Sequence, residues 1–417
     1  LLGRLKTNFQ LSELAKSPRF TEWLNLTAEF TIRSLQNWRY SMNSIQYLLQ
    51  LWGRLVAAMP YMKTETPDTL RSSESLRAAV MRVIESYVTI MIDSVETVVM
   101  HPDIEHPLED EGLFDQMDRF HTIARAQYPQ VAQLLLTNFQ QYLSQYEQVL
   151  SSTGVNPQLI EVIEGKLTWL TYMVAAIVGG FNANDPRRRD EDQKIDGTLS
   201  QAVFRLIEML EFRAKSSGGA QLASDKLETG ILYYFRMFKK VYLTEHFAGP
   251  GGLNAAAQPL LPPLAHVAPI RDKGAQEQQS PHKVFFEHLN MGDLQRVMNV
   301  VVEKLCSNIK FWRDDSDVLE ATLDAFADLV STYGSCKTLL SLETVQFLVQ
   351  HHTGDFFPFL GYNTDNKHRT TFYHALSRLV FSSAEDLNNS FDEFVTPNLA
   401  ILGQLSNTQD LRQPPVK

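Results

Sequence analysis

The stretch "KLTWLTYMVAAIVGG", residues 166–180, is the most apolar in the chain and runs into the strongly charged "FNANDPRRRDEDQ". A membrane anchor, a strand in the core of a sheet and a buried helix would all be apolar. As a helix, the run from Leu167 to Gly180 would span only ~21 Å, whereas the hydrocarbon of a bilayer is ~30 Å thick. The run also lacks the alternation of a strand. We therefore predict a buried helix and no membrane insertion.

The residues before this run extend the helix and give it a clear start. In "NPQLIEVIEGKLTW", Asn156 suits the N-cap and Pro157 the first helical position, while Gly179 and Gly180 suit the C-terminal end. The polar residues of the helix fall mostly three or four apart, so they form one narrow stripe. These residues are Glu161, Glu164, Lys166, Thr168 and Thr171. A helix of this kind is covered by protein on most sides.

The composition is that of a globular chain with an acidic surface. The chain has 417 residues, of which 44% are hydrophobic, and its formal net charge is −10. A single compact core rarely grows beyond ~250–300 residues, so we expect several domains or an elongated core. Nucleic-acid binding depends on clustered Lys and Arg, which the charge argues against. We predict no nucleic-acid partner and favour protein partners with a basic surface.

Chemistry-bearing motifs are sparse. Cys306 and Cys336 are too few for a zinc site or a disulfide framework. His351 and His352 are adjacent rather than one helical turn apart, which makes them poor joint metal ligands and favours a role at a helix end or on the surface. No nucleophile, metalloprotease or phosphate-loop motif occurs. We predict no catalytic residues, no cofactor, no metal site and no enzymatic activity.

Helical periodicity recurs along almost the whole chain. The segment "YVTIMI" resembles a strand, but the apolar residues around it repeat at helical spacing. No convincing strand pair occurs, so we predict an all-α fold. The predicted helices cover residues 20–36, 43–59, 74–100, 111–126, 130–151, 157–178, 197–213, 222–243, 293–310, 317–332, 337–350, 368–381 and 388–405.

The helices are expected to stack as antiparallel hairpins. Hairpins would begin at irregular intervals, the shorter of which approach the ~40–47 residues of a HEAT unit. We therefore predict a HEAT-repeat-like α-solenoid. Residues 246–283 are rich in Gly, Pro, Ala and Gln and have little periodicity, which predicts a disordered insertion. The predicted organisation is thus helical hairpins over 1–245, the insertion over 246–283, and further hairpins over 284–417.

Two acidic stretches are the candidate partner-binding sites. "DIEHPLEDEG" and "DPRRRDEDQKID" both fall between predicted helices, where a solenoid displays loops to its partners. The alternative is solvated loop charge, in which Arg187 to Arg189 neutralise the second stretch locally. The candidate residues are Glu109, Asp110, Glu111, Asp190, Glu191 and Asp192.

Several stretches resemble one known family. "LGRLKTNFQLSELAK", "SIQYLLQLWGRLVAAMPY", "PLEDEGL", "GKLTWLTYMVAAIVGG", "KLETGILYYFRMFKKVYL" and "HRTTFYHALSRLV" are together similar to the middle of the exportin-7 (Ran-binding protein 16) family, within the importin-β (karyopherin) superfamily. The resemblance covers most of residues 1–381, in the same order. The chain begins in the middle of a helical pattern, so we expect it to be a fragment of such a protein.

The resemblance implies a nuclear transport receptor that shuttles between nucleus and cytoplasm. It would bind Ran-GTP, mainly through an N-terminal region that precedes this chain, and it would carry folded protein cargo past the nucleoporins of the nuclear pore. It would have no enzymatic activity. A generic HEAT-repeat scaffold for a multiprotein complex would share the helices and the acidic charge, so it remains the alternative.

Overall fold

The fold is known from a computed structural model, which describes residues 10–62, 67–152, 156–180, 190–243, 282–361 and 366–381, together with single positions beyond 381. All regular secondary structure in these ranges is helical, and no strand occurs among them. The predicted all-α fold is confirmed. The chain divides into two compact units, Leu1–Phe238 and Lys239–Lys417. The predicted insertion over 246–283 lies outside the described residues, apart from its last two positions.

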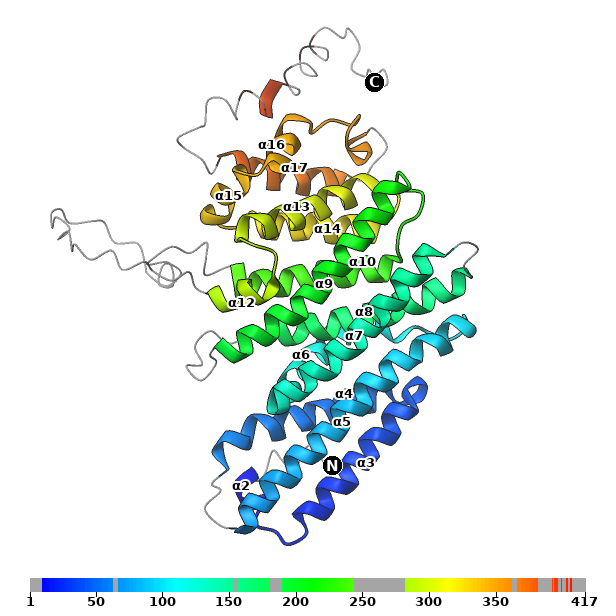
Figure 1. The fold of residues 1–417 in the computed structure, drawn as a ribbon, viewed down its shortest axis with the longest axis vertical. Helices are drawn as coiled ribbons and strands as arrows, with labels where there is room; N and C mark the ends of the chain where they lie inside the picture. Colours follow the sequence, from blue (N-terminus) through cyan, green and yellow to red (C-terminus); the bar gives the residue numbers. More distant parts are fainter. Residues whose placement is uncertain are drawn as a thin grey trace, which may run out of the picture. The chain divides into compact units, whose positions relative to one another are not determined.

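Unit 1 is a two-layered stack of helices (Figure 1). One layer contains α3, α5, α7 and α9, in which each helix packs on the next, and the other contains α4, α6, α8 and α10 in the same manner. This alternation is the packing of an α-solenoid, in which every element touches only near neighbours. The helices are α2 (Leu11–Leu14), α3 (Phe20–Gln36), α4 (Trp38–Ala58), α5 (Pro67–Met100), α6 (Leu113–Ala124), α7 (Tyr128–Ser151), α8 (Pro157–Gly179), α9 (Asp190–Ser216) and α10 (Asp225–Phe238), with short 3-10 turns η1 (Met59–Tyr61), η2 (Pro107–Glu109) and η3 (Arg125–Gln127).

The helix α8 is the most enclosed element of unit 1. It packs on α5, α6, α7, α9 and α10, and from Leu167 to Gly179 every residue is buried. Asn156 caps its start by accepting a hydrogen bond from Gln158 N (3.0 Å), as the sequence predicts. Among the described residues, only α8 is long and apolar enough to cross a membrane, and 89% of that window is buried inside the protein. The helix passes this test of length because it begins at Pro157, before the apolar run. It is nevertheless a core helix, since the protein covers most of it.

Two glycines let neighbouring helices approach α8 closely. A Cβ atom added to Gly165 would lie 2.6 Å from Cγ1 of Val95 on α5. One added to Gly179 would lie 2.5 Å from Cβ of Met237 on α10. Both distances are shorter than any normal contact between carbon atoms, so larger side chains at these positions would force the helices apart.

Gly179→Ala is expected to lower the free energy of unfolding by ~1–3 kcal/mol, because the new methyl group would overlap the Cβ atom of Met237. Gly53→Ala in α4 is the matched control, since its Cβ would meet nothing closer than Thr122 at 3.9 Å. There the higher helix propensity of alanine should leave stability equal or raise it by ~0.5–1 kcal/mol. Denaturant unfolding of both variants measures the difference, and equal stabilities would contradict the close approach.

Unit 2 is also entirely helical over its described residues. Its helix α13 packs on α14 and α16, while α17 packs on α14 and α15. Lys239 ties the start of the unit to the end of α14, since its Nζ donates to the Asp328 carboxylate at 2.7 Å and also to the Asp328 carbonyl. The elements are the π-helical turn η4 (Lys239–Leu243), α12 (Lys283–Leu289), α13 (Leu294–Phe311), α14 (Ser316–Leu329), α15 (Tyr333–Leu340), α16 (Glu343–Gln350), η6 (Pro358–Leu360) and α17 (Asn366–Phe381).

The largest differences between the predicted and the observed helices concern three elements. The helix expected from residue 74 begins at Pro67, and the helix expected from 197 begins at Asp190. The helix expected over 337–350 is two helices, because Leu342 is extended (φ −85°, ψ 132°) and separates α15 from α16. The helix expected over 388–405 falls mainly outside the described residues.

Candidate functional site

The second acidic stretch lies in a helix rather than in a loop. Asp190, Glu191 and Asp192 form the first turn of α9, which corrects the loop placement inferred from the sequence. Carboxylates are favourable there because the positive end of the helix dipole lies at the N-terminus. The preceding residues 181–189, which include the three arginines, lie outside the described residues.

The three carboxylates of this turn have different surroundings. Asp190 and Glu191 are exposed, and Glu191 pairs with Lys194 one turn later (2.8 Å). Asp192 is half-buried and lies 3.5 Å from Nη1 of Arg125, whose side chain is only 11% exposed. Asp190 and Glu191 are therefore accessible to a partner, whereas Asp192 belongs to the packing of α9.

Arg125 connects this turn to the end of α8. Its Nη2 donates to the carbonyl of Ile177 (2.6 Å), and its guanidinium lies 4.1 Å from the centre of the Tyr128 ring. The Tyr128 hydroxyl in turn donates to the carboxylate of Asp196. Burial, and then the charge of Asp196, raises the pKa of Tyr128 well above its usual value. The first turn of α9 is thus held in place by α8 and by the start of α7.

The first acidic stretch is anchored by α4 and α10. Glu109, at the end of η2, is about half exposed and pairs with Lys226 of α10 (3.0 Å). Asp110 accepts hydrogen bonds from Gly112 N (2.7 Å) and from the side chain of Gln46 (3.2 Å), so it shapes the turn. Glu111 is exposed. Of the three, Glu109 and Glu111 present carboxylates to solvent, and Asp110 has a structural role.

His106 also stabilises this turn, as the N-cap residue of η2. Its Nδ1 accepts a hydrogen bond from Leu108 N (3.1 Å). Burial, and then the nearby positive charge of Lys226, lowers the pKa of His106 to about 4. The imidazole is therefore neutral at physiological pH and remains an acceptor, which keeps the turn in this conformation.

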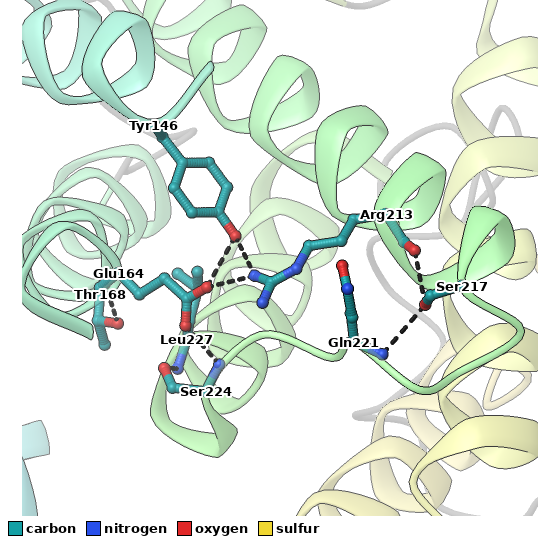
Figure 2. Close-up of polar contacts among 8 residues, drawn as sticks. All are labelled: Tyr146, Glu164, Thr168, Arg213, Ser217, Gln221, Ser224 and Leu227. Atoms are coloured by element: carbon teal, nitrogen blue, oxygen red, sulfur yellow. Dashed lines mark hydrogen bonds and ion pairs between the residues drawn. The ribbon is translucent and has the colours of Figure 1, made fainter. Parts of the chain in front are cut away.

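A buried ion pair between Glu164 and Arg213 joins α7, α8 and α9 (Figure 2). This pair is not predicted from the sequence. Glu164 Oε1 accepts hydrogen bonds from Arg213 Nη1 (2.6 Å) and from the Tyr146 hydroxyl (2.8 Å). Its Oε2 accepts one from Ser224 N (2.7 Å), in the segment that leads to α10. The side chain of Glu164 is 5% exposed and that of Arg213 is 15% exposed. The sequence shows a carboxylate next to an apolar run, which is a sign of a buried charge. Its partners cannot be predicted, because they lie 18 to 60 residues away.

The charged and polar groups described above either hold the helices together or lie on the surface. Burial, and then the carboxylate of Glu164, raises the pKa of Tyr146, so its hydroxyl stays protonated and remains a donor. Within the described ranges, no group of three or more His, Cys, Asp and Glu side chains has the arrangement to hold a metal ion. Cys306 and Cys336 are not joined by a disulfide bond.

Comparisons with known proteins agree with this architecture. A family model described as "Exportin-7-like, TPR domain" matches residues 95–368. Exportin-7-B of Xenopus laevis is 32% identical over 100% of this chain and 35% of its own length. Human Ran-binding protein 17 is 30% identical over 95% of the chain and 33% of its own length, and Exportin-7 of Dictyostelium discoideum is 24% identical over 95% and 35%. No solved structure matches.

The two-layered stack of helices defines an α-helical repeat protein of the solenoid type. The chain belongs to the exportin-7-like family. The resemblance stated from the sequence is confirmed, and the chain spans about a third of the length of the curated relatives that it matches. Those relatives are named as exportins and Ran-binding proteins.

Proposed function

We propose that this chain is a segment of a nuclear transport receptor of the exportin type. The observation that carries the proposal is the match of the exportin-7-like family model to 95–368, on a chain whose whole length aligns with Exportin-7-B. The receptor would carry protein cargo through nuclear pores in a Ran-GTP-dependent manner and would shuttle between nucleus and cytoplasm. Its partners would be Ran-GTP, cargo proteins and nucleoporins.

The layered packing of unit 1 supports a mechanism based on flexing. Because the main packing partners of each helix are at most three helices away, small rotations between neighbours can change the curvature of the stack. A partner that binds one curvature better shifts the population toward it. If cargo and Ran-GTP favour the same curvature, each strengthens the binding of the other. Hydrolysis of GTP would then release the cargo.

The proposed role of the accessible carboxylates is to attract a basic face of Ran or of cargo. Asp190 and Glu191 lie on a helix turn whose position is fixed through Asp192 and Arg125. Glu109 and Glu111 lie on a turn that Lys226 and Asp110 hold. Solvent-exposed ion pairs add only ~0–1 kcal/mol each to affinity, so the main effect would be on the rate of association.

The function is tested with the complete gene product that contains this chain. Immobilised protein is incubated with Ran loaded with a non-hydrolysable GTP analogue or with GDP, in the presence of cytosolic proteins. We expect capture of GTP-loaded Ran together with a reproducible set of cargo proteins, and little capture of GDP-loaded Ran. Equal, weak binding of both forms would instead favour a generic scaffold.

The variant Asp190→Ser with Glu191→Ser tests the acidic turn of α9. We expect the association rate with a basic partner to fall by about threefold to tenfold at low salt, and its salt dependence to become flatter, because two attracting charges are removed. Glu85→Ser with Asp93→Ser is the control, since both residues are exposed on α5 and the net charge changes equally. If the two double variants associate at the same rate, the α9 turn has no role in binding.

A further inference from the structure

Three aromatic rings meet on the layer of unit 1 that contains α4, α6, α8 and α10. Helices α6 and α10 both pack on α8. The rings of Phe114 on α6 and Tyr233 on α10 lie 5.2 Å apart, centre to centre. The ring of Tyr172 on α8 lies 6.4 Å from that of Phe114 and 5.3 Å from that of Tyr233. The three residues therefore form one contact group, which we call the aromatic cluster.

The aromatic cluster has a buried base and an accessible edge. Tyr172 is only 4% exposed, whereas Phe114 is 52% exposed and Tyr233 is half-buried. Single exposed apolar side chains are common on protein surfaces, but contacting aromatic rings are enriched where proteins bind one another. The rigid base formed by Tyr172 keeps the accessible rings in place. The cluster is thus a candidate contact surface.

Carboxylates lie beside the accessible edge. Asp115 follows Phe114 directly on α6, and Asp118 lies one turn further along the same helix. Glu111 precedes Phe114 by three residues, and all three acidic residues are exposed. Asp118 lies 3.5 Å from its sequence neighbour Arg119, in a surface ion pair of the kind that contributes little and can exchange. The exposed side of α6 therefore combines an aromatic ring with negative charge.

The charge reaches the ring contributed by α10. Burial raises the pKa of Tyr233, and the carboxylate of Asp118 raises it further, by more than the guanidinium of Arg236 lowers it. The Tyr233 hydroxyl therefore stays protonated at physiological pH, and of the two charges that act on it the negative one has the larger effect. A cation that approached the cluster would be attracted.

We propose that the aromatic cluster, together with Asp115 and Asp118, binds an arginine side chain of a partner protein. A guanidinium group is planar, stacks on aromatic rings and pairs with carboxylates in a fixed geometry. A lysine ammonium group is a strongly hydrated point charge and suits this combination less well. The inference goes beyond the proposed transport function and does not depend on it, because the site recognises a side chain rather than a particular partner.

The role of this site differs from that of the acidic turns. Exposed carboxylates attract a basic surface from a distance and act mainly on the rate of association. Stacking on a ring operates only in contact, so the aromatic cluster would act mainly on the rate of dissociation. It would also distinguish arginine from lysine, which long-range attraction alone does not.

Peptide binding to the intact chain tests the site. Glycine-rich peptides of equal length carry arginine, lysine or citrulline at the same positions, and fluorescence anisotropy gives the Kd of each. We expect the arginine peptide to bind about threefold more tightly than the lysine peptide. The citrulline peptide should bind least, because it keeps the planar group without the charge. Equal affinity for the arginine and lysine peptides would overturn the proposal.

Phe114→Ala locates the contact. Because Phe114 is exposed, we expect the variant to fold and to lose most of the preference for arginine over lysine. Phe212→Ala is the matched control, since Phe212 is a 76% exposed phenylalanine on α9, in the other layer, and its loss should leave the preference unchanged. A preference that survives in Phe114→Ala would mean that arginine binds elsewhere.

Asp118→Asn tests the carboxylate of the site. We expect the arginine peptide to bind about threefold more weakly, since its charge loses a direct counter-charge. Asp93→Asn is the control, because Asp93 is exposed on α5 and the net charge changes equally. If both variants weaken binding to the same extent, the peptide responds to overall charge and the site assignment is wrong.

Discussion

Glu164→Gln is expected to lower the free energy of unfolding by ~3–5 kcal/mol, which is the usual effect of removing one partner of a buried ion pair. The loss arises because the guanidinium of Arg213 would remain buried without its counter-charge, 2.6 Å from the position of the former carboxylate. The Tyr146 hydroxyl and Ser224 N would also lose a charged acceptor. Denaturant unfolding followed by circular dichroism measures the change.

Two further variants separate the ion pair from the general effect of a substitution in α8. Glu161→Gln is the matched control, since Glu161 is exposed on the same helix one turn earlier, and we expect a change within ~0.5 kcal/mol. Replacing Glu164 and Arg213 together by Met should recover part of the lost stability, because neither charge is then left alone. A Glu164→Gln protein as stable as the unmodified chain would show that the pair does not hold α7, α8 and α9 together.

Trp169→Ala is expected to cost ~3–5 kcal/mol, as large-to-small substitutions of buried aromatic residues do. Trp169 is fully buried within α8, so its removal leaves a cavity among helices that already approach closely at Gly165 and Gly179. Thermal unfolding should show a clearly lower Tm.

Tyr40→Ala provides the comparison for that experiment. Tyr40 is a large aromatic residue on α4 that is 90% exposed, so its truncation should leave the Tm nearly unchanged. If Trp169→Ala and Tyr40→Ala had the same Tm as the unmodified chain, α8 would not be the core helix described here.

The helices whose ends depend on neighbouring residues are predicted correctly from the sequence. The predicted bounds 20–36 match α3, and the capping residue Asn156 and the terminal Gly179 and Gly180 define α8 as the sequence indicates. Apolar periodicity and helix-ending residues are properties of adjacent positions, so they can be read without knowledge of the fold. The same holds for the absence of strand-like alternation.

Features that depend on distant residues were missed. The sequence predicts a loop at the first turn of α9, because the charged residues there lack apolar periodicity. In the structure this turn is helical, and Arg125 of η3 and the helix dipole stabilise it. Glu164 looked like part of a polar stripe, although Arg213 and Ser224 bury it. The sequence predicts which acidic residues are candidates for binding a partner. That Asp110 and Asp192 instead anchor their turns is seen only from their contacts in the structure.

The order of packing in unit 1 has a consequence for synthesis of the chain. Since each helix finds its main partners within the next three helices, contact order is low, and the unit can assemble progressively as it leaves the ribosome. The helix α8 packs on α5, α6 and α7, which are made before it, and on α9 and α10, which are made after it, so its apolar surface is fully covered only once α10 has been made. Until α10 has been made, the part of α8 that α10 covers is exposed to water, so we expect chaperones to bind the nascent chain at α8 during that interval.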